Sequence, residues 1–257
     1  MSTTSKVQYL SPPVKVSMAD SWFEITAADH FWIKRRFAVL QKLAGNLFEN
    51  AKNIVEIGCG HGLVQSDVET AYERDVVGFD LNEEALKRNV SQRSAVYCYD
   101  VRQRNEAFRQ KFDLILLFDV LEHIDDENAF LDAIQYHLSS DGNLIVNVPA
   151  GEWAYSAYDR AAGHVRRYSA ETLVDATRRN GLAVARWTYW GLPLTPALAL
   201  RKFLLRHQTE EKKIITSGFD RRNDMTNYLM GLASKCEPIP QKFIGSSLMA
   251  VLQRKAP

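Results

Sequence analysis

A turn built on three alternate glycines constrains the fold of this chain more than any other feature. Residues 55–62 read Val-Glu-Ile-Gly-Cys-Gly-His-Gly, and a helical pattern follows from Leu63. Glycine permits positive φ and close approach to bare main chain, so the pattern predicts a strand that turns tightly into a helix beside a ligand. A dinucleotide-binding turn reads G-x-G-x-x-G, but here the third glycine comes one residue early and Glu56 precedes the first. The acidic residue disfavours a diphosphate and favours a ligand that carries an ammonium group.

Three aspartates continue this pattern along the chain. Asp80, Asp100 and Asp119 each follow a short apolar run that is typical of a buried strand. Helical patterns alternate with these runs, which indicates an α/β fold with a doubly wound parallel sheet. An acidic residue at such a strand end can deliver its carboxylate to a bound ligand.

Taken together, these segments resemble class I S-adenosylmethionine-dependent methyltransferases. The glycine turn is similar to the family signature E/D-x-G-x-G-x-G, and 119–124 is similar to its D-V-L-E-H-I segment. The resemblance implies a Rossmann-like, seven-stranded sheet with an antiparallel last strand and a helical insert before that strand. It also implies S-adenosyl-L-methionine as the cofactor, with Asp80 on the ribose hydroxyls and Asp100 near the adenine amino group. The cofactor-binding residues so implied are Trp32, Arg36, Glu56, Gly58, Cys59, Gly60, Gly62, Asp80, Leu81, Asp100, Val101, Phe118 and Asp119.

Further motifs resemble a bacterial subgroup of these enzymes over about 29–255. Residues 29–36 are similar to its H-F-W-F-x-x-R-R helix, although Lys34-Arg35 replaces the usual arginine and small residue. Residues 158–169 are similar to its D-x-x-x-G-H-x-R-R-Y-S/T loop, and 245–248 to its closing G-S-S-L. Glycans and lipid-linked sugars are the substrates suggested for some members.

The pattern of apolar residues, turns and caps also predicts where the elements lie. Helices are expected over 28–48 and 170–180, the latter capped by Ser169, and a turn at Asp141-Gly142. Strands are expected over 53–57, 75–79, 95–99, 112–118, 143–148, 183–189 and 247–253. We expect one methyltransferase domain, 1–257, with a loose N-terminal arm (1–27), a first helix (28–50), a cofactor-binding core (51–190), a substrate or lid insert (191–240) and the last strand (241–257).

The predicted first helix carries Trp32 and Arg36, and two interpretations of these residues are open. Arginine makes two-point contacts with carboxylates, so Arg36 could bind the cofactor carboxylate while the Trp32 indole covers its aliphatic part. Alternatively, the helix buries its aromatic residues and leaves Lys34 and Arg35 in water. The residues alone leave both open.

Acceptor binding and catalysis are expected after the fifth strand. His164 can take a proton from an acceptor hydroxyl, while Arg166, Arg167 and Tyr168 can hold the acceptor. Alternatively, the two arginines pair with Asp159 or Glu171 and fix the loop.

His123 is the alternative catalytic base, because it follows the strand that ends beside the expected methyl group. With Glu122, Asp125 and Asp126, it could instead hold a divalent ion. Adjacent residues on one element rarely face the same ion without further ligands, so we expect no metal.

The composition limits which classes of partner the protein is expected to bind. A net charge of +1 gives no general attraction to nucleic acid, and three cysteines without metal-ligand spacing indicate a reducing, cytoplasmic setting. Residues 194–206 could form a basic amphipathic helix that contacts a membrane surface, although a pocket lid or dimer contact explains the same pattern. We expect a monomer or homodimer.

The sequence therefore predicts an O-methyltransferase that acts on a small-molecule, glycan or lipid-linked acceptor. Two alternatives are a noncatalytic S-adenosylmethionine-binding partner subunit and, less compatible with the glycine spacing, an NAD-dependent oxidoreductase.

Overall fold

The computed structural model describes residues 7–14, 30–206, 208, 210, 214 and 224–255, with the backbone alone at 224–226. The rest of the N-terminal arm and parts of the insert expected at 191–240 lie outside these residues.

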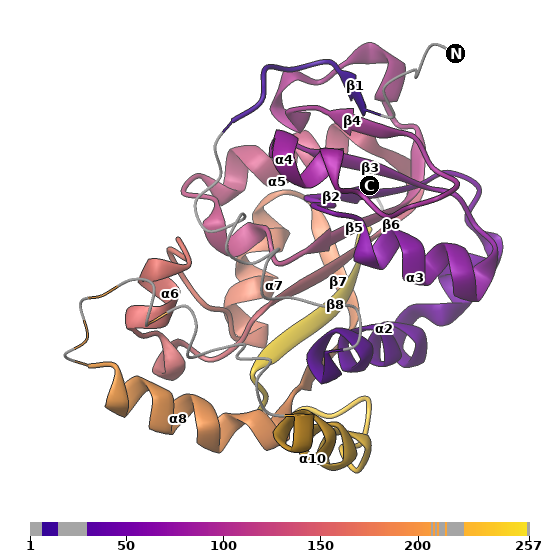
Figure 1. Cartoon of the computed structure of the whole chain (residues 1–257). Coiled ribbons are helices and arrows are strands. Elements are labelled where there is room, and N and C mark those ends of the chain that lie inside the picture. The colour runs from indigo at the N-terminus through magenta and orange to yellow at the C-terminus, as the bar shows by residue number, and fades with distance from the viewer. Residues whose placement is uncertain are drawn as a thin grey trace.

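One mixed sheet forms the centre of the described chain, with strand order β1-β4-β3-β2-β5-β6-β8-β7 (Figure 1). Strands β1 to β6 run parallel, whereas β8 is antiparallel to both neighbours, β6 and β7. This confirms the predicted fold class and the antiparallel last strand. The strands are β1 (Val7–Tyr9), β2 (Ile54–Ile57), β3 (Val76–Asp80), β4 (Val96–Cys98), β5 (Phe112–Phe118), β6 (Leu138–Pro149), β7 (Leu182–Trp190) and β8 (Ser247–Arg254).

The sheet has eight strands rather than the expected seven, because part of the N-terminal arm joins it as β1. Val7 is buried and pairs with Val96 on β4, and beyond the strand the backbone N–H of Ser11 donates to the Cys98 carbonyl at 3.0 Å. Val14 N–H then donates to the Leu81 carbonyl at 3.0 Å. The arm is therefore not loose over 7–14, since the backbone groups at the edge of β4 provide partners for it.

Helices cover both faces of the sheet. The buried side chains of α2 and α3 pack with Leu114 and Leu116 of β5, whereas those of α5 and α7 pack with Ile115 and Leu117. Alternate residues of a central strand thus face opposite helical layers, as in a sheet buried on both sides. The longer helices are α2 (Phe31–Asn50), α3 (Leu63–Tyr72), α5 (Glu127–His137), α7 (Ala170–Arg179), α8 (Thr195–Leu204) and α10 (Asp224–Lys235). The short helical turns are α4 (Glu83–Lys87), α6 (Ala157–Ala161), η1 (Val101–Gln103), η2 (Glu106–Phe108), η3 (Leu121–His123), η4 (Glu152–Ala154) and η5 (Leu192–Leu194).

Local sequence signals explain where several elements begin and end. The Ser169 hydroxyl accepts from Thr172 N–H at the start of α7, and Gly181, with φ of +64°, follows the end of that helix. The turn expected at Asp141-Gly142 is not observed. Strand β6 already begins at Leu138, and the two residues lie within it, where its register with β5 shifts. Such an irregularity keeps the strand continuous where a turn was predicted.

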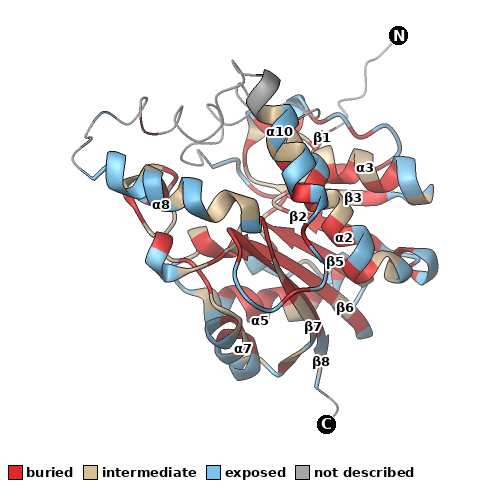
Figure 2. Cartoon of the chain, turned by 90° about the horizontal axis from the view of Figure 1, so that it is seen from below, coloured by how far each residue is buried: buried red, intermediate tan, exposed pale blue. Residues whose placement is uncertain are grey.

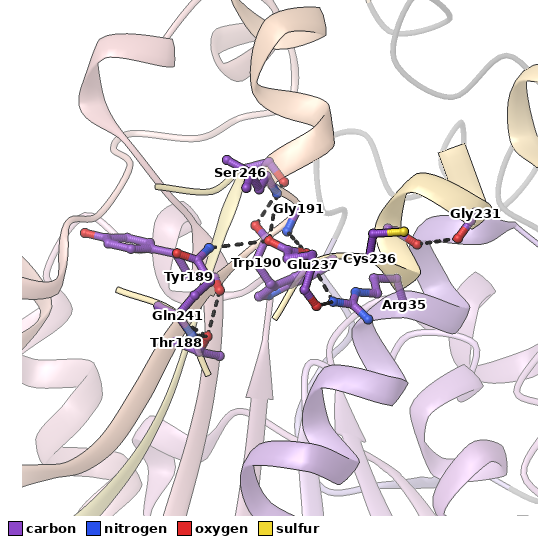
Figure 3. A network of polar contacts seen from close by, with 12 residues as sticks. Arg35, Thr188, Tyr189, Trp190, Gly191, Gly231, Cys236, Glu237, Gln241 and Ser246 are labelled. Carbon is purple, nitrogen blue, oxygen red and sulfur yellow. Dashed lines mark hydrogen bonds and ion pairs between the residues drawn. The ribbon is translucent and has the colours of Figure 1, made fainter. Parts of the chain in front are cut away.

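The insert between β7 and β8 packs beneath α2 through a buried polar network (Figures 1 and 3). Arg35 on α2 donates to the Glu237 carboxylate at 3.2 Å, and the same carboxylate accepts from Gly191 N–H at 3.0 Å and Leu192 N–H at 2.9 Å. The interpretation that leaves Arg35 in water is therefore wrong. The ion pair fixes the two ends of the insert against the first helix.

Helix α8 exposes most of its surface (Figure 2). Leu200, Phe203 and Leu204 are exposed, while Arg201 stacks on the Tyr158 ring at 3.8 Å and Lys202 donates to the Trp153 carbonyl. Arg206, the third basic residue of 194–206, lies over the Phe203 ring at 4.2 Å, so all three basic side chains have contacts within the chain. Among the residues described, no helix combines the length and the apolar character needed to cross a bilayer.

Candidate functional site at the carboxyl edge of the sheet

The predicted glycine turn links β2 to α3. Gly58, Gly60 and Gly62 have φ of +77°, +51° and +79°, a region that favours glycine. A Cβ on Gly58 would lie 2.2 Å from Cγ2 of Val120, so the turn lies against the segment that follows β5. Cys59 is buried and packs beside β4. The turn therefore brings bare main chain to the carboxyl edge of the sheet.

Asp80 closes this turn from the end of β3. Its Oδ2 accepts from Gly60 N–H at 2.7 Å, and its Oδ1 accepts from Leu81 N–H at 2.7 Å and Asn82 N–H at 2.8 Å. Burial raises the pKa of Asp80, and these backbone hydrogen bonds oppose that rise. Carboxylate oxygens accept more than one hydrogen bond, so the group can still take a hydroxyl from a ligand.

Glu56 is the most unusual carboxyl group at the turn. It is buried within β2, and its Oε2 has no hydrogen-bond partner. Burial raises the pKa of Glu56 to about 8, although the charge of Arg36 opposes the rise. A buried acceptor without a donor is costly, and a ligand ammonium group would satisfy it. The residue therefore fits the cofactor that the sequence implies.

Trp32 and Arg36 lie together on α2 at this edge. The Arg36 guanidinium lies 4.8 Å from the Trp32 ring centroid, and its Nη1 is 2.5 Å from Oδ2 of Asp119. Asn147 on β6 donates to the other oxygen of Asp119 at 2.8 Å, and Trp190 donates to Asn147 at 2.9 Å. A guanidinium has five donors, so the bond to Asp119 does not exclude a cofactor carboxylate. Trp32 is buried core, as the second interpretation expected, and the contact of Arg36 with a cofactor carboxylate stays a prediction.

Sequence reasoning did not single out Asn147 or Trp190. Each lies on a strand with nothing to distinguish it from an ordinary buried residue in the sequence.

Asp100 and Val101 lie at the end of β4, and Phe118 ends β5. Val101 is buried. The Asp100 carboxylate accepts hydrogen bonds from the Arg102 guanidinium, and the bond from Nη2 to Oδ2 is 2.8 Å long. The backbone N–H of Asp100 donates to the Ser11 hydroxyl at 2.8 Å, so the N-terminal segment also reaches this edge. Arg102 is exposed, and a surface ion pair of this kind contributes little free energy. Asp100 can therefore exchange the pair with Arg102 for a ligand contact at little cost.

The two candidate bases are neighbours although they come from different elements. His123 ends η3, His164 follows α6, and their ring centroids are 4.8 Å apart at 79°. His123 Nδ1 is 3.2 Å from the Gly163 carbonyl, and His164 Nδ1 is 3.0 Å from Oδ1 of Asp159. Burial, with a smaller effect of the neighbouring His164, lowers the pKa of His123 to about 4. Both predicted catalytic residues therefore share one place at the sheet edge.

Asp159, one of the two pairing partners expected for the arginines, anchors this part of the site. Burial would raise its pKa, but hydrogen bonds from His164 and Arg167 outweigh that effect and lower the pKa to about 2. Arg167 is buried and donates to Asp159 at 2.7 Å and to the Ala150 carbonyl at 3.1 Å. The Asp159–Arg167 pair thus fixes the loop that presents His164.

The other residues expected to bind the acceptor also have partners within the chain. Arg166 donates to Glu127 at 2.8 Å and to the Asp125 carbonyl at 3.0 Å. The buried Tyr168 donates its hydroxyl proton to the same Glu127 carboxylate at 2.8 Å. This arrangement matches the alternative in which the arginines fix the loop, with Glu127 as a partner that the sequence did not indicate.

Comparison with known proteins gives matches to methyltransferases. The model of the family described as "Methyltransferase domain" matches residues 28–186. A Mycobacterium tuberculosis protein named "Probable S-adenosylmethionine-dependent methyltransferase" is 29% identical over 125 residues, which are 47% of this chain and 43% of that protein. The "Ubiquinone biosynthesis O-methyltransferase" of Bartonella quintana is 34% identical over 111 residues, or 41% of this chain and 44% of its own length. The chain thus spans less than half the length of these two relatives.

A solved structure supports the fold. The structure of an S-adenosylmethionine-dependent methyltransferase from Archaeoglobus fulgidus aligns with a TM-score of 0.54 and 14% identity, over 88% of this chain and 96% of that one. At this identity the similarity concerns the fold alone.

Proposed function

Because the chain belongs to the methyltransferase-domain family, we propose that it is an S-adenosyl-L-methionine-dependent O-methyltransferase. One observation carries the cofactor assignment: three glycines with positive φ, the Glu56 carboxyl with its unpartnered Oε2, and Asp80 meet at one sheet edge. Glu56 suits the cofactor ammonium, Asp80 its ribose hydroxyls, and Arg36 with Trp32 its carboxylate end. Asp100, Val101 and Leu81 complete the adenine side of this proposed site. Phe118, whose ring centroid lies 5.6 Å from the Arg36 guanidinium, belongs to the carboxylate end.

The proposed reaction needs alignment and removal of one proton. The cofactor supplies a methyl group that its sulfonium already activates. The acceptor oxygen forms a bond to the methyl carbon as the carbon–sulfur bond breaks, and that electron pair stays on sulfur to give S-adenosylhomocysteine. The acceptor proton leaves toward His123 and His164. Asp159 and Arg167 fix the loop that carries His164.

A hydroxyl acceptor is favoured by the paired histidines, and one relative is named as an O-methyltransferase. A small molecule, a glycan or a lipid-linked sugar is the proposed acceptor class. In this proposal Arg167 and Tyr168 position the loop, and Arg166 and His164 lie closer to the acceptor. The exposed apolar face of α8 suits contact with a lipid-linked acceptor at a membrane surface better than it suits nucleic acid.

Calorimetric titration with S-adenosylmethionine, S-adenosylhomocysteine and NADH tests the cofactor. Asp80→Ala should remove binding of the first two, whereas Asp75→Ala, an exposed carboxylate just before the same strand, should leave it unchanged. Preference for NADH would instead support an oxidoreductase. An acceptor screen with methyl-labelled cofactor then separates an enzyme from a noncatalytic binding subunit, which would bind the cofactor and transfer nothing.

A further inference from the structure

Three potential metal ligands converge beside the proposed methyl-transfer site. One ligand atom from each of Glu122, His123 and His164 lies within 4.8 Å of those of the other two. Glu122 is 1% exposed, and its Oε2 has no hydrogen-bond partner. A buried carboxyl group with an oxygen that has no donor, close to two imidazoles, needs a cation or a proton to be stable.

The hydrogen bonds of both histidines fix which ring nitrogen carries the proton. The Gly163 carbonyl and the Asp159 carboxylate can only accept, so the Nδ1 that meets each must carry the proton. The neutral ring then has its lone pair on Nε2. Metal-binding histidines characteristically donate their second N–H to a carboxylate or a backbone carbonyl, and the two histidines here use one of each.

We propose that Glu122, His123 and His164 form a binding site for one divalent transition-metal ion. Bonds from such an ion to nitrogen or oxygen are about 2.0–2.2 Å, so the three ligand atoms must approach one another by about 1 Å. His123 and His164 are only partly buried, and rotation of their side chains can supply this movement. Two imidazoles with one carboxylate suit Zn²⁺, Co²⁺, Fe²⁺ or Mn²⁺ better than Mg²⁺ or Ca²⁺, which prefer oxygen ligands alone.

The site deepens the proposed function and rests on it for its role. Val120, two residues before Glu122, is the residue that a Cβ on Gly58 would strike, so the cluster begins against the cofactor turn. Three protein ligands leave room for an acceptor oxygen on the ion, and a bound cation lowers the pKa of such a hydroxyl. With the ion bound, the Nε2 lone pairs of both histidines are its ligands, so the acceptor proton leaves to water instead of to His123 or His164. The sequence expectation of no metal assumed that the ligands would come from one element. The loop after β6 supplies His164 as the ligand from a second element.

Metal binding is measurable without cofactor or acceptor. We suggest calorimetric titration of chelator-treated protein with Zn²⁺, Co²⁺ and Mg²⁺, and metal analysis after dialysis, all in a Cys236→Ser background because Cys236 is exposed. We expect one Zn²⁺ or Co²⁺ per chain and at least tenfold weaker Mg²⁺ binding. His123→Ala, His164→Ala and Glu122→Gln should each weaken Zn²⁺ binding more than the about 10–100-fold typical of losing an outer hydrogen-bond partner.

His30→Ser is the matched control, because it removes a histidine outside the cluster and keeps an oxygen that can cap α2. Circular dichroism and S-adenosylmethionine titration verify that each variant is folded. Absence of Zn²⁺ and Co²⁺ binding, or equal affinity in His164→Ala and His30→Ser, would overturn the proposal. Suppose that the unsubstituted protein binds the ion, and the His123, His164 and Glu122 variants fail to bind it, while none of these proteins binds S-adenosylmethionine. In that case the metal site stands and the proposed function fails.

Discussion

Replacing Glu237 by glutamine should destabilise the protein strongly, because Glu237 joins the insert to the first helix. Its side chain is fully buried, and that of Arg35 is 7% exposed. The carboxylate accepts from Arg35 and Gly191 N–H (Figure 3), and also from Leu192 N–H. A glutamine NH2 would therefore face a donor and leave the guanidinium charge unpaired. Breaking one partner of a buried pair costs about 3–5 kcal/mol.

The assay is urea unfolding followed by tryptophan fluorescence, with the free energy of unfolding extrapolated to water. A loss of 3–5 kcal/mol corresponds to a fall in Tm of about 6–20 °C at 2–4 °C per kcal/mol for a chain of this size. Glu106→Gln is the matched control, because its pair with Arg109 is exposed and 3.7 Å long, and it should cost less than about 0.5 kcal/mol.

A double-mutant cycle with Arg35→Met separates the ion pair from packing. Once the guanidinium is gone, Glu237→Gln should cost much less than it does in the natural chain. A loss below about 1 kcal/mol for Glu237→Gln alone, or equal losses with and without Arg35, would refute the reasoning.

Three further predictions concern the site itself. Glu56, whose pKa burial raises to about 8, is mostly protonated at pH 7, so binding of an ammonium group should release a proton. Binding should tighten as pH rises from 6 to 7, before the ligand amine begins to lose its own proton. Calorimetry in buffers of different ionisation enthalpy measures the release, and release that persists in Glu56→Gln would contradict the prediction. Gly58→Ala should cost about 2–5 kcal/mol from positive φ and the clash with Val120, and Val120→Ala should recover the clash part; no recovery in urea unfolding would argue against that contact. Trp190→Phe removes the donor to the buried Asn147 and should cost about 1–3 kcal/mol by the same assay, whereas a neutral change would show that the bond contributes nothing.

Much of the fold was predictable because strong local patterns produced it. The alternate glycines required positive φ, and apolar runs ending in aspartate marked the strands beside them. β1 was missed because three residues of weak alternation carry no signal until the edge of β4 is present to pair with them. The antiparallel last strand came from the family resemblance rather than from its residues.

The polar network of the site could not be predicted, because its partners lie far apart in sequence. Nothing near Arg35 indicates Glu237, and nothing near Arg36 indicates that it meets Asp119. The same holds for the metal expectation, which considered only residues next to His123 and had no means of placing His164 beside it. Such contacts follow from the tertiary fold, and a local pattern does not encode them.

The most direct test of the central claim is a crystal structure of the protein with S-adenosylhomocysteine, which carries the same ammonium, carboxylate and ribose groups as the cofactor. We predict the ammonium within hydrogen-bonding distance of Glu56, the ribose hydroxyls on Asp80 and the homocysteine sulfur facing His123 and His164. A ligand bound elsewhere, or bound at this edge without contact to Glu56 and Asp80, would contradict the account.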